Sequence, residues 1–229
     1  MRAEPSAGRA GGPSADGTRA RLISAAEVLF AARGIDGVSL REINRASGAR
    51  NAVAVQYHFE DRDGVIRAIL EKHRPGVEVS RHRLLDEYEA EAKVDLRALS
   101  GALVRPLAEK LADPDGGLEY LQIQSELVNR TVATTRPGSR EDRNDSINRW
   151  RNLVGPFLGE DAERLHRRFT VIRFSSAELG RRAASGRHRD DRLFISHLVD
   201  LVTALLVAPT SPETLALADA KDASRRPYR

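Results

Sequence analysis

The side chains best suited to chemistry lie in one short segment, ARNAVAVQYHF, at residues 49–59. The guanidinium of Arg50 suits a bidentate contact with guanine, because its parallel N–H groups match the two acceptors of that base. The amides of Asn51 and Gln56 carry the paired donor and acceptor that suits adenine. The chemistry expected of this segment is therefore the reading of base edges in the major groove of DNA.

The other members of the segment divide into apolar contacts and packing residues. One of Val53 and Val55 is expected against a thymine methyl group, because their side chains offer only apolar surface. Phe59 is expected in the core, and His58 is expected either as half-buried packing or as a phosphate contact. Asn51 has a second interpretation as the cap of the helix that follows, and both roles stay open.

A catalytic or metal site is not expected anywhere in the sequence. The chain has no cysteine, and its six histidines are scattered without a metal-binding HExxH pair. The sequence also lacks a GxSxG nucleophile motif and a phosphate-binding glycine loop. We therefore predict no enzyme activity, no cofactor and no metal.

Short helices position the candidate base-reading segment. Apolar residues recur at helical spacing over residues 18–33, which predicts an amphipathic helix. Ser39 precedes Glu42 by three residues, the spacing at which each side chain caps the backbone N–H of the other. A second helix is predicted over residues 40–46, and Ser47-Gly48 breaks it before a third helix opens near Asn51. This arrangement is typical of a helix-turn-helix, whose second short helix enters the major groove.

The rest of the chain is predicted to be helical, because no stretch alternates apolar and polar residues with the period of a strand. Proline and glycine, as at Pro75-Gly76, separate the helices. The predicted helices span residues 61–73, 77–92, 96–112, 118–134, 140–158, 161–184 and 190–207. The fold class expected is all-α.

The segment from Thr18 to Leu70 resembles the N-terminal DNA-binding domain of the TetR family of transcriptional repressors. The resemblance rests on the helix end AAEVLFAARG, the VSLREI start of the second helix, and YHF followed by an acidic and a basic residue. The sequence departs from the commonest family pattern in two ways. Ala49 to Phe59 makes eleven residues where the family usually has ten, and Gln56 stands where the family often has tyrosine.

The resemblance implies a homodimeric, ligand-responsive repressor with a larger helical ligand-binding and dimerisation domain after the three-helix DNA-binding domain. Tyr57 and Arg62 resemble phosphate-contacting residues of the family. Arg41 can hold a phosphate together with the free N–H groups at the start of its helix, and Thr18 is a candidate of the same kind. The predicted phosphate contacts are Thr18, Arg41, Tyr57, His58 and Arg62.

Four segments are predicted along the chain. Residues 1–17 are rich in Gly, Pro, Ser and Ala and are expected to be a disordered tail. The helix-turn-helix domain is expected over residues 18–62 and the regulatory and dimerisation domain over residues 63–220. A polar, frayed tail is expected over residues 221–229.

A ligand pocket is expected among the aromatic and apolar residues of the second domain. The candidates are Tyr88, Leu107, Tyr120, Gln124, Trp150, Phe169 and Arg173. Arg173 lies between Ile172 and Phe174, and a cation among apolar neighbours needs an anion or must extend to water. A carboxylate on the ligand and an intramolecular Asp or Glu are both possible partners.

The helix over residues 190–207 is apolar on more than one face, so it needs covering on more than one side. The resemblance implies that it pairs with the helix over residues 161–184 in a four-helix dimer interface. The alternative is a central helix buried within one subunit. The predicted interface residues are Phe194, Leu198, Leu201 and Leu205.

The expected partners are double-stranded DNA, a second copy of the chain and an unidentified small molecule. The formal net charge of +4 is compatible with binding to nucleic acid. Most of this positive charge lies in the N-terminal part, since residues 1–59 carry eight Arg and five acidic residues. The longest apolar run, Leu198 to Ala208, is shorter than the ~20 residues that a membrane helix needs, so no membrane partner is expected. With no signal peptide evident, a cytoplasmic, nucleoid-associated bacterial protein is expected. The alternative function is a DNA-binding or scaffolding protein without an inducer.

Overall fold

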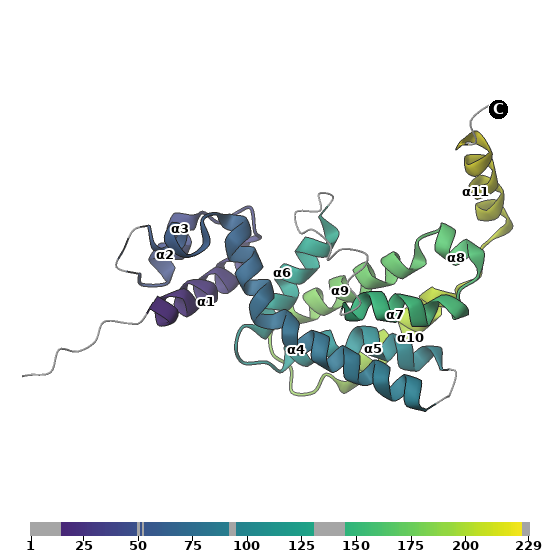
Figure 1. Cartoon of the computed structure of the whole chain (residues 1–229), viewed down its shortest axis with the longest axis horizontal. Helices are drawn as coiled ribbons and strands as arrows, with labels where there is room; N and C mark the ends of the chain where they lie inside the picture. Colours follow the sequence, from purple (N-terminus) through teal and green to yellow (C-terminus); the bar gives the residue numbers. More distant parts are fainter. Residues whose placement is uncertain (1–14, 50, 52, 92–94, 131–144, 226–229) are drawn as a thin grey trace, which may run out of the picture. The chain divides into compact units, whose positions relative to one another are not determined.

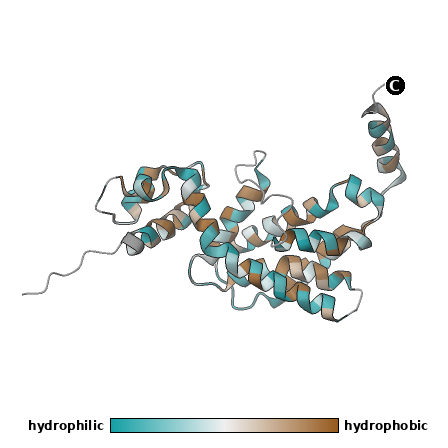
Figure 2. Ribbon diagram, in the orientation of Figure 1, coloured by the Kyte–Doolittle hydropathy of each residue, from teal (hydrophilic) through white to brown (hydrophobic). Residues whose placement is uncertain are grey.

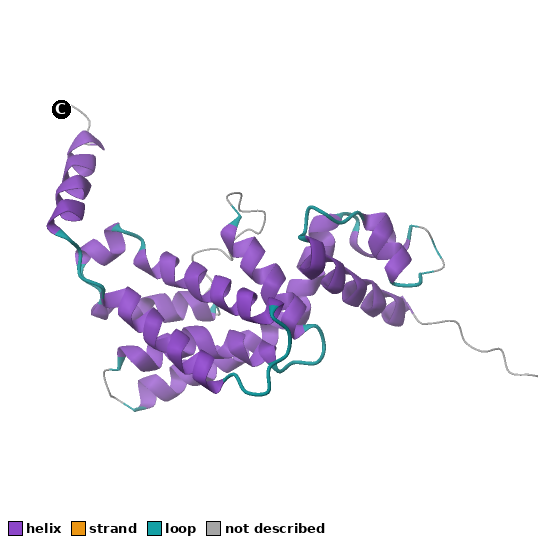
Figure 3. Ribbon diagram, turned by 180° about the vertical axis from the view of Figure 1, so that it is seen from behind, coloured by secondary structure: helices purple, strands orange, loops and turns teal. Residues whose placement is uncertain are grey.

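The computed structural model describes residues 15–49, 51, 53–91, 95–130 and 145–225. Every regular element in these ranges is a helix, as the all-α prediction requires (Figure 1 and Figure 3). The chain divides into two compact units, Met1–Lys72 and His73–Arg229, which we call the N-terminal and C-terminal units. The predicted domain limit at residues 62 and 63 lies earlier, and the roles assigned to the two domains stay a prediction.

The N-terminal unit contains α1 (Ala15–Arg33), α2 (Leu40–Ala46), α3 (Ala54–Phe59) and the first part of α4 (Arg62–Ala90). Its core is built from the apolar residues that recur at helical spacing in the sequence. They include Leu22, Ala26, Phe30, Ile35, Val38, Ile43, Val55, Phe59, Val65 and Ile69, each at most 5% exposed. The tail prediction for residues 1–17 is wrong at its end, because α1 already begins at Ala15. A glycine such as Gly17 lowers helix propensity by only ~1 kcal/mol, which the rest of the helix offsets.

The C-terminal unit packs α4 from His73 onward, together with the helices that follow it, around a separate core. These later helices are α5 (Leu96–Ala108), α6 (Gly117–Asn129), α7 (Ser146–Val154), α8 (Glu160–Arg164), α9 (Arg167–Ala184), α10 (Arg192–Val207) and α11 (Pro212–Arg225), with short 3₁₀ helices η1 (Glu109–Leu111) and η2 (Gly155–Phe157). Helix α6 packs on α9, and α10 packs on both α5 and α9. Hydrophobic and hydrophilic residues are interleaved along these helices (Figure 2), as expected for amphipathic elements that bury one face.

Helices α6 and α9 approach closely at Gly180 of α9. A methyl group added there would lie 2.5 Å from the Cβ of Ser125 and 3.2 Å from the carbonyl oxygen of Leu121, both on α6. Only a residue without a side chain therefore allows α6 and α9 to approach this closely.

Several predicted helix limits are wrong. Helix α4 runs through Pro75, where a break was expected; the helix continues because residues on both sides of the proline, among them Ile69 and Val77, are buried. The helix expected over residues 161–184 is two helices, since His166 takes a left-handed backbone conformation with φ of 56°.

The C-terminal end also differs from expectation. The segment 221–229 was predicted as a frayed tail, but α11, which the sequence analysis did not predict, extends to Arg225. Ion pairs from Arg164 to Asp219 (2.7 Å) and Asp222 (2.8 Å) hold it to α8. In the described part of the chain no single helix is long and apolar enough to cross a membrane; α10 and α11 qualify only as a pair, and they are bent by 58°.

Candidate nucleic-acid interface

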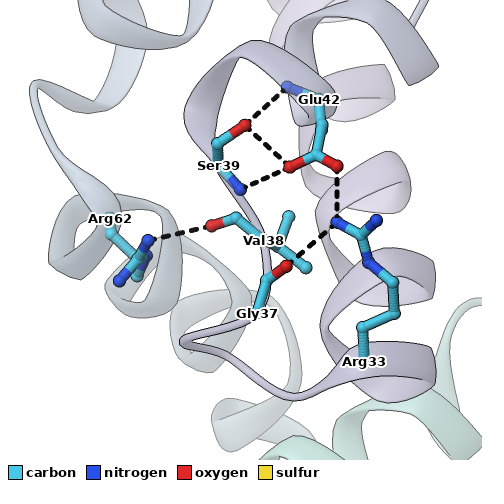
Figure 4. A network of polar contacts seen from close by, with 6 residues as sticks. All are labelled: Arg33, Gly37, Val38, Ser39, Glu42 and Arg62. Atoms are coloured by element: carbon cyan, nitrogen blue, oxygen red, sulfur yellow. Dashed lines mark hydrogen bonds and ion pairs between the residues drawn. The ribbon is translucent and has the colours of Figure 1, made fainter.

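The start of α2 is held by the capping box that the sequence predicted (Figure 4). The backbone N–H of Ser39 donates to Oε2 of Glu42 at 2.8 Å, and the backbone N–H of Glu42 donates to Oγ of Ser39 at 3.3 Å. Arg33, at the end of α1, donates to Oε1 of Glu42 at 2.8 Å and to the carbonyl of Gly37 at 3.1 Å. Hydrogen bonds from Ser39 and then from Arg33 lower the pKa of Glu42 to about 2. The carboxylate therefore fixes the angle at which α2 leaves α1.

Arg62 fixes the same connection from the other side (Figure 4). It donates through Nη2 to the carbonyl of Val38 at 2.9 Å and lies 3.5 Å from the carboxylate of Asp36. Its Nε is buried and has no hydrogen-bond partner among the described residues. The guanidinium is thus engaged within the unit, and a phosphate contact by Arg62 has to be made by the remaining, exposed part of the group.

The turn between α2 and α3 is shaped by backbone contacts. Gly48 has a φ of 65°, which is the left-handed region that favours glycine, and this ends α2 where Ser47-Gly48 predicted. Asn44 of α2 donates to the carbonyl of Asn51 at 2.8 Å. These contacts position the start of α3 relative to α2.

The side chain of Asn51 makes no cap hydrogen bond to α3, whose N-cap residue is Val53, so the capping interpretation is wrong. Its Oδ1 accepts from the backbone N–H of Val53 at 3.1 Å, and its carbonyl accepts from the N–H of Ala54, the first residue of α3, at 3.2 Å. The side chain is nevertheless exposed, and an amide oxygen with one hydrogen bond retains a second acceptor site. The exposed amide of Asn51 therefore stays a candidate for a base contact, which remains a prediction.

The two faces of α3 separate the remaining candidates. Ala54, Val55 and Phe59 are buried, so Val55 belongs to the core and only Val53, at 52% exposed, offers a surface to a thymine methyl group. Gln56 and Tyr57 are exposed next to it, and Tyr57 reaches 81%. Arg50, the predicted guanine contact, lies outside the described residues.

The other predicted phosphate contacts lie around this face. His58 is half-buried between the rings of Tyr57 and Phe59, with centroids at 5.1 Å and 6.0 Å. Thr18 accepts a hydrogen bond from Arg21 at 3.3 Å. Arg41 on α2 is exposed, and its guanidinium makes no hydrogen bond or ion pair with the described residues. These cations and hydroxyls are the group types that hold phosphates.

Arg45 is a further candidate for a phosphate contact that was not predicted from the sequence. This residue is exposed one helical turn after Arg41 and likewise makes no ion pair with the described residues. Residues four apart in a helix share a face, so α2 presents two adjacent cations. The four-residue spacing of Arg41 and Arg45 is the sequence signal that could have predicted this second cation.

The predicted ligand-pocket residues do not form one cavity in the described part of the chain. Leu107, Tyr120 and Trp150 are at most 7% exposed and are core residues; Trp150 donates through Nε1 to the carbonyl of Leu99 at 2.8 Å. The ring of Tyr120 stacks on His73 at 4.6 Å, and burial raises the pKa of its hydroxyl to about 12.

The remaining candidates of the pocket are spread over the surface. Gln124 is half-buried on α6, Tyr88 lines a cleft of about 220 Å³, and Phe169 lines a separate cleft of about 510 Å³. Arg173 is exposed: its Nε donates to Oδ1 of Asn129 at 3.1 Å, and its guanidinium lies 5.7 Å from the ring of Phe169. The cation therefore extends to water beside an amide, and the expected Asp or Glu partner is absent among the described residues.

Of the predicted dimer-interface residues of α10, one is buried and the others are at least partly exposed. Leu198 is 2% exposed and packs in the core of its own unit, which corrects its assignment to an interface. Leu201 is 37% exposed, and Phe194 and Leu205 are half-buried along the same edge of the helix. Leu193, which was not predicted, is 84% exposed. The described residues contain no group of three or more His, Asp or Glu placed to hold a metal ion.

One comparison with known proteins matches a family model to part of the N-terminal unit. Residues 22–69, which include the capping box and α3, match the family model described as bacterial regulatory proteins, tetR family. No curated protein matches the chain significantly. Among solved structures, the chain is similar to a TetR-family regulator from Streptomyces coelicolor A3, with 18% sequence identity, 87% of this chain and 99% of the other covered, and a TM-score of 0.40.

Proposed function

Because the chain carries the DNA-binding domain of the TetR family of bacterial regulatory proteins and is a transcriptional regulator, we propose that it is a repressor that acts as a homodimer. The dimer binds an inverted-repeat operator, and a small, mainly apolar molecule releases it. The role is regulatory, without a catalytic step. The second candidate function is a DNA-binding or scaffolding protein that responds to no small molecule.

The observation that carries the proposal is the exposed face of α3. A capped α2 and the Asn44–Asn51 hydrogen bond hold α3 so that Val53, Gln56 and Tyr57 are exposed while the opposite face is buried. Gln56 and Asn51 contact adenine, Val53 contacts a thymine methyl group, and Arg50 contacts guanine. The short helix is thus the recognition helix.

Phosphate contacts fix the register of the recognition helix on the duplex. Arg41 and Arg45 supply charge from α2, and Thr18, Tyr57 and His58 supply hydrogen bonds. Arg62 contributes chiefly by holding the connection between α1 and α2 through the carbonyl of Val38. This division separates cations whose loss weakens all DNA binding from side chains whose loss changes sequence preference.

Dimerisation uses the exposed apolar edge of α10. Leu193 and Leu201 expose large apolar surface there, with Phe194 and Leu205 partly covered beside them. Burying such apolar surface against a second copy favours association, and the net affinity is smaller than the area alone gives because association costs translational and side-chain freedom. The two-fold symmetry of the dimer then requires half-sites about one helical turn of DNA apart, or a multiple of it.

Footprinting of genomic fragments, beginning with the DNA upstream of the gene itself, tests the proposal, together with the mass of the protein in solution. We expect a dimer that protects a palindromic site. A monomeric protein that prefers no fragment over random DNA would overturn the proposal. Thermal stabilisation by a small molecule distinguishes the ligand-responsive repressor from the second candidate.

A further inference from the structure

A cleft of about 670 Å³ opens in the C-terminal unit between α5, η1 and the segment 187–196 that leads into α10. Its apolar lining comes from Ala108, Leu111, Ala112 and Ile195. Small-molecule sites in proteins commonly measure ~300–1,000 Å³ and combine an apolar surface with a few polar groups. The cleft has the size and the apolar wall of such a site.

The polar part of the lining is dominated by arginine. Arg105 from α5 and Arg187 and Arg189 from the connection before α10 line the cleft and are exposed. Arg187 donates one hydrogen bond to the carbonyl of Asp113 at 3.0 Å. None of the three makes an ion pair with a carboxylate in the ranges that the structure describes. Three guanidinium groups are thus available to an anion.

Two of the three acidic residues that line the same cleft are paired with arginines. Asp190 pairs with Arg192 at 2.7 Å, and hydrogen bonds from that arginine lower the pKa of Asp190 to about 2. Asp191 pairs with Arg182 of α9 at 2.7 Å. Glu109 accepts a hydrogen bond from the hydroxyl of Ser80 at 2.7 Å and is the one carboxylate of the described lining without a cationic partner. The cleft therefore keeps a positive surplus beside its apolar wall.

We propose that this cleft binds a small molecule that carries a carboxylate on a compact apolar body. The apolar body covers Ala112 and Ile195, and the carboxylate takes hydrogen bonds from Arg105 and Arg189. Arginine suits this role because its planar N–H groups match a carboxylate and its face stacks on an aromatic ring. The site is separate from the residues near Arg173 at which the sequence placed a ligand.

The position of the cleft on α10 also gives it a regulatory role, and this role alone rests on the proposed function. Ile195 and Arg192 line the cleft, while Leu193 and Leu201 of the same helix are exposed. A molecule in the cleft contacts α5 and α10 together and favours one spacing of the two helices. It thereby acts on α10, the helix through which the proposed dimer forms.

The test uses the full chain and three probes in isothermal titration calorimetry. 2-Naphthoate carries both parts of the ligand, 2-naphthamide carries the apolar body without charge, and acetate carries the anion alone. We expect saturable binding of 2-naphthoate, with both other probes weaker by about tenfold or more. Equal binding of 2-naphthamide, equal binding of acetate, or no binding of 2-naphthoate would each overturn the proposal.

Variants locate the site. Arg105→Gln and Arg189→Gln should each weaken 2-naphthoate by about tenfold. The control Arg83→Gln removes an exposed arginine of α4 that pairs with Glu87 outside the cleft, and it should leave affinity unchanged. Ala112→Phe fills the cleft from the exposed end of η1 and should abolish binding with an unchanged far-ultraviolet spectrum. Wild-type affinity in Ala112→Phe, or in both arginine variants, would contradict the assignment.

Failure of the site and failure of the proposed function give different results. A protein that protects an operator but binds no 2-naphthoate contradicts the cleft proposal and leaves the repressor intact. A protein that binds 2-naphthoate through Arg105 but protects no DNA contradicts the repressor and leaves the cleft intact. If both proposals hold, 2-naphthoate releases the wild-type protein from its operator and fails to release Arg105→Gln at the same concentration.

Discussion

The crossing of α6 and α9 at Gly180 provides the sharpest test of packing in the C-terminal unit. An added methyl group would lie 2.5 Å from the Cβ of Ser125, whereas ordinary contacts of this kind are 3.4–4 Å. Gly180→Ala must therefore push the two helices apart by about 1 Å, and overpacking of a well-packed core costs ~1–3 kcal/mol. Alanine has a higher helix propensity than glycine by ~1 kcal/mol, so part of the stability lost through the clash is offset in the single variant.

A double-mutant cycle removes that ambiguity. Ser125→Gly deletes the atom that clashes, so the combination with Gly180→Ala should be more stable than the sum of the two single changes by ~1–3 kcal/mol. Urea unfolding followed by the fluorescence of Trp150, the single tryptophan, reports on this unit. The control is Gly155→Ala, since a methyl group there has no neighbour within 4 Å.

If Gly180→Ala is as stable as Gly155→Ala and shows no coupling with Ser125→Gly, the two helices cross at a greater distance than the 2.5 Å at this point implies, and the clash is refuted. Helix α9 is also one of the helices expected near the dimer interface. The dimer dissociation constant of the same variants should therefore be measured from their molar mass in solution.

The remaining predictions concern the N-terminal unit. Ser39→Ala removes the cap of α2 and should destabilise that helix by ~0.5–2 kcal/mol, measured by amide hydrogen exchange; unchanged protection would refute the role of the cap. The pKa of Glu42 is lowered from 4.5 to about 2, so its ionised form stabilises the folded unit fully above pH 4.5 and loses this effect as the pH falls toward 2. The stability difference between wild type and Glu42→Gln should therefore shrink over that range in thermal melts, and a difference independent of pH would contradict this. Gln56→Ala should relax preference at one base position, at a cost of ~1–3 kcal/mol, and unchanged preferences in binding-site selection would exclude Gln56 as a base contact. Arg41→Ala should weaken all sequences alike and reduce the salt slope of operator binding by about 1; an unchanged slope would exclude a phosphate contact.

Features that depend on neighbours within one or two helical turns could be predicted from the residue types and their spacing alone. Ser39 and Glu42 are three residues apart, and this spacing alone brings both capping hydrogen bonds within reach once a helix starts. Gly48 likewise ends α2 through its own backbone preference. The helix-turn-helix was predictable because its signals are local and occur in the required order.

Which face of each helix is covered depends instead on how the helices pack against one another. Val53 and Val55 are equivalent as residue types, but only Val55 is buried under the neighbouring helices. Arg62 donates a hydrogen bond to the carbonyl of Val38, twenty-four positions earlier, and no local sequence pattern predicts that contact. Burial and long-range hydrogen bonds depend on partners distant in sequence, so they could not be predicted from spacing.

The same reason explains the C-terminal unit. Arg81 has an ordinary position in the sequence, yet it is 2% exposed and donates to the carbonyl of Ala102 at 3.2 Å and to the hydroxyl of Ser146 at 2.8 Å. Arg173 has apolar neighbours in the sequence, yet the packing of α9 on α6 leaves it exposed beside Asn129. Residue types alone could suggest cations as candidates for a ligand site. Arg105 and Arg189 line one cleft because α5 packs against α10. They are far apart in sequence, so their proximity depends on the fold of the chain between them.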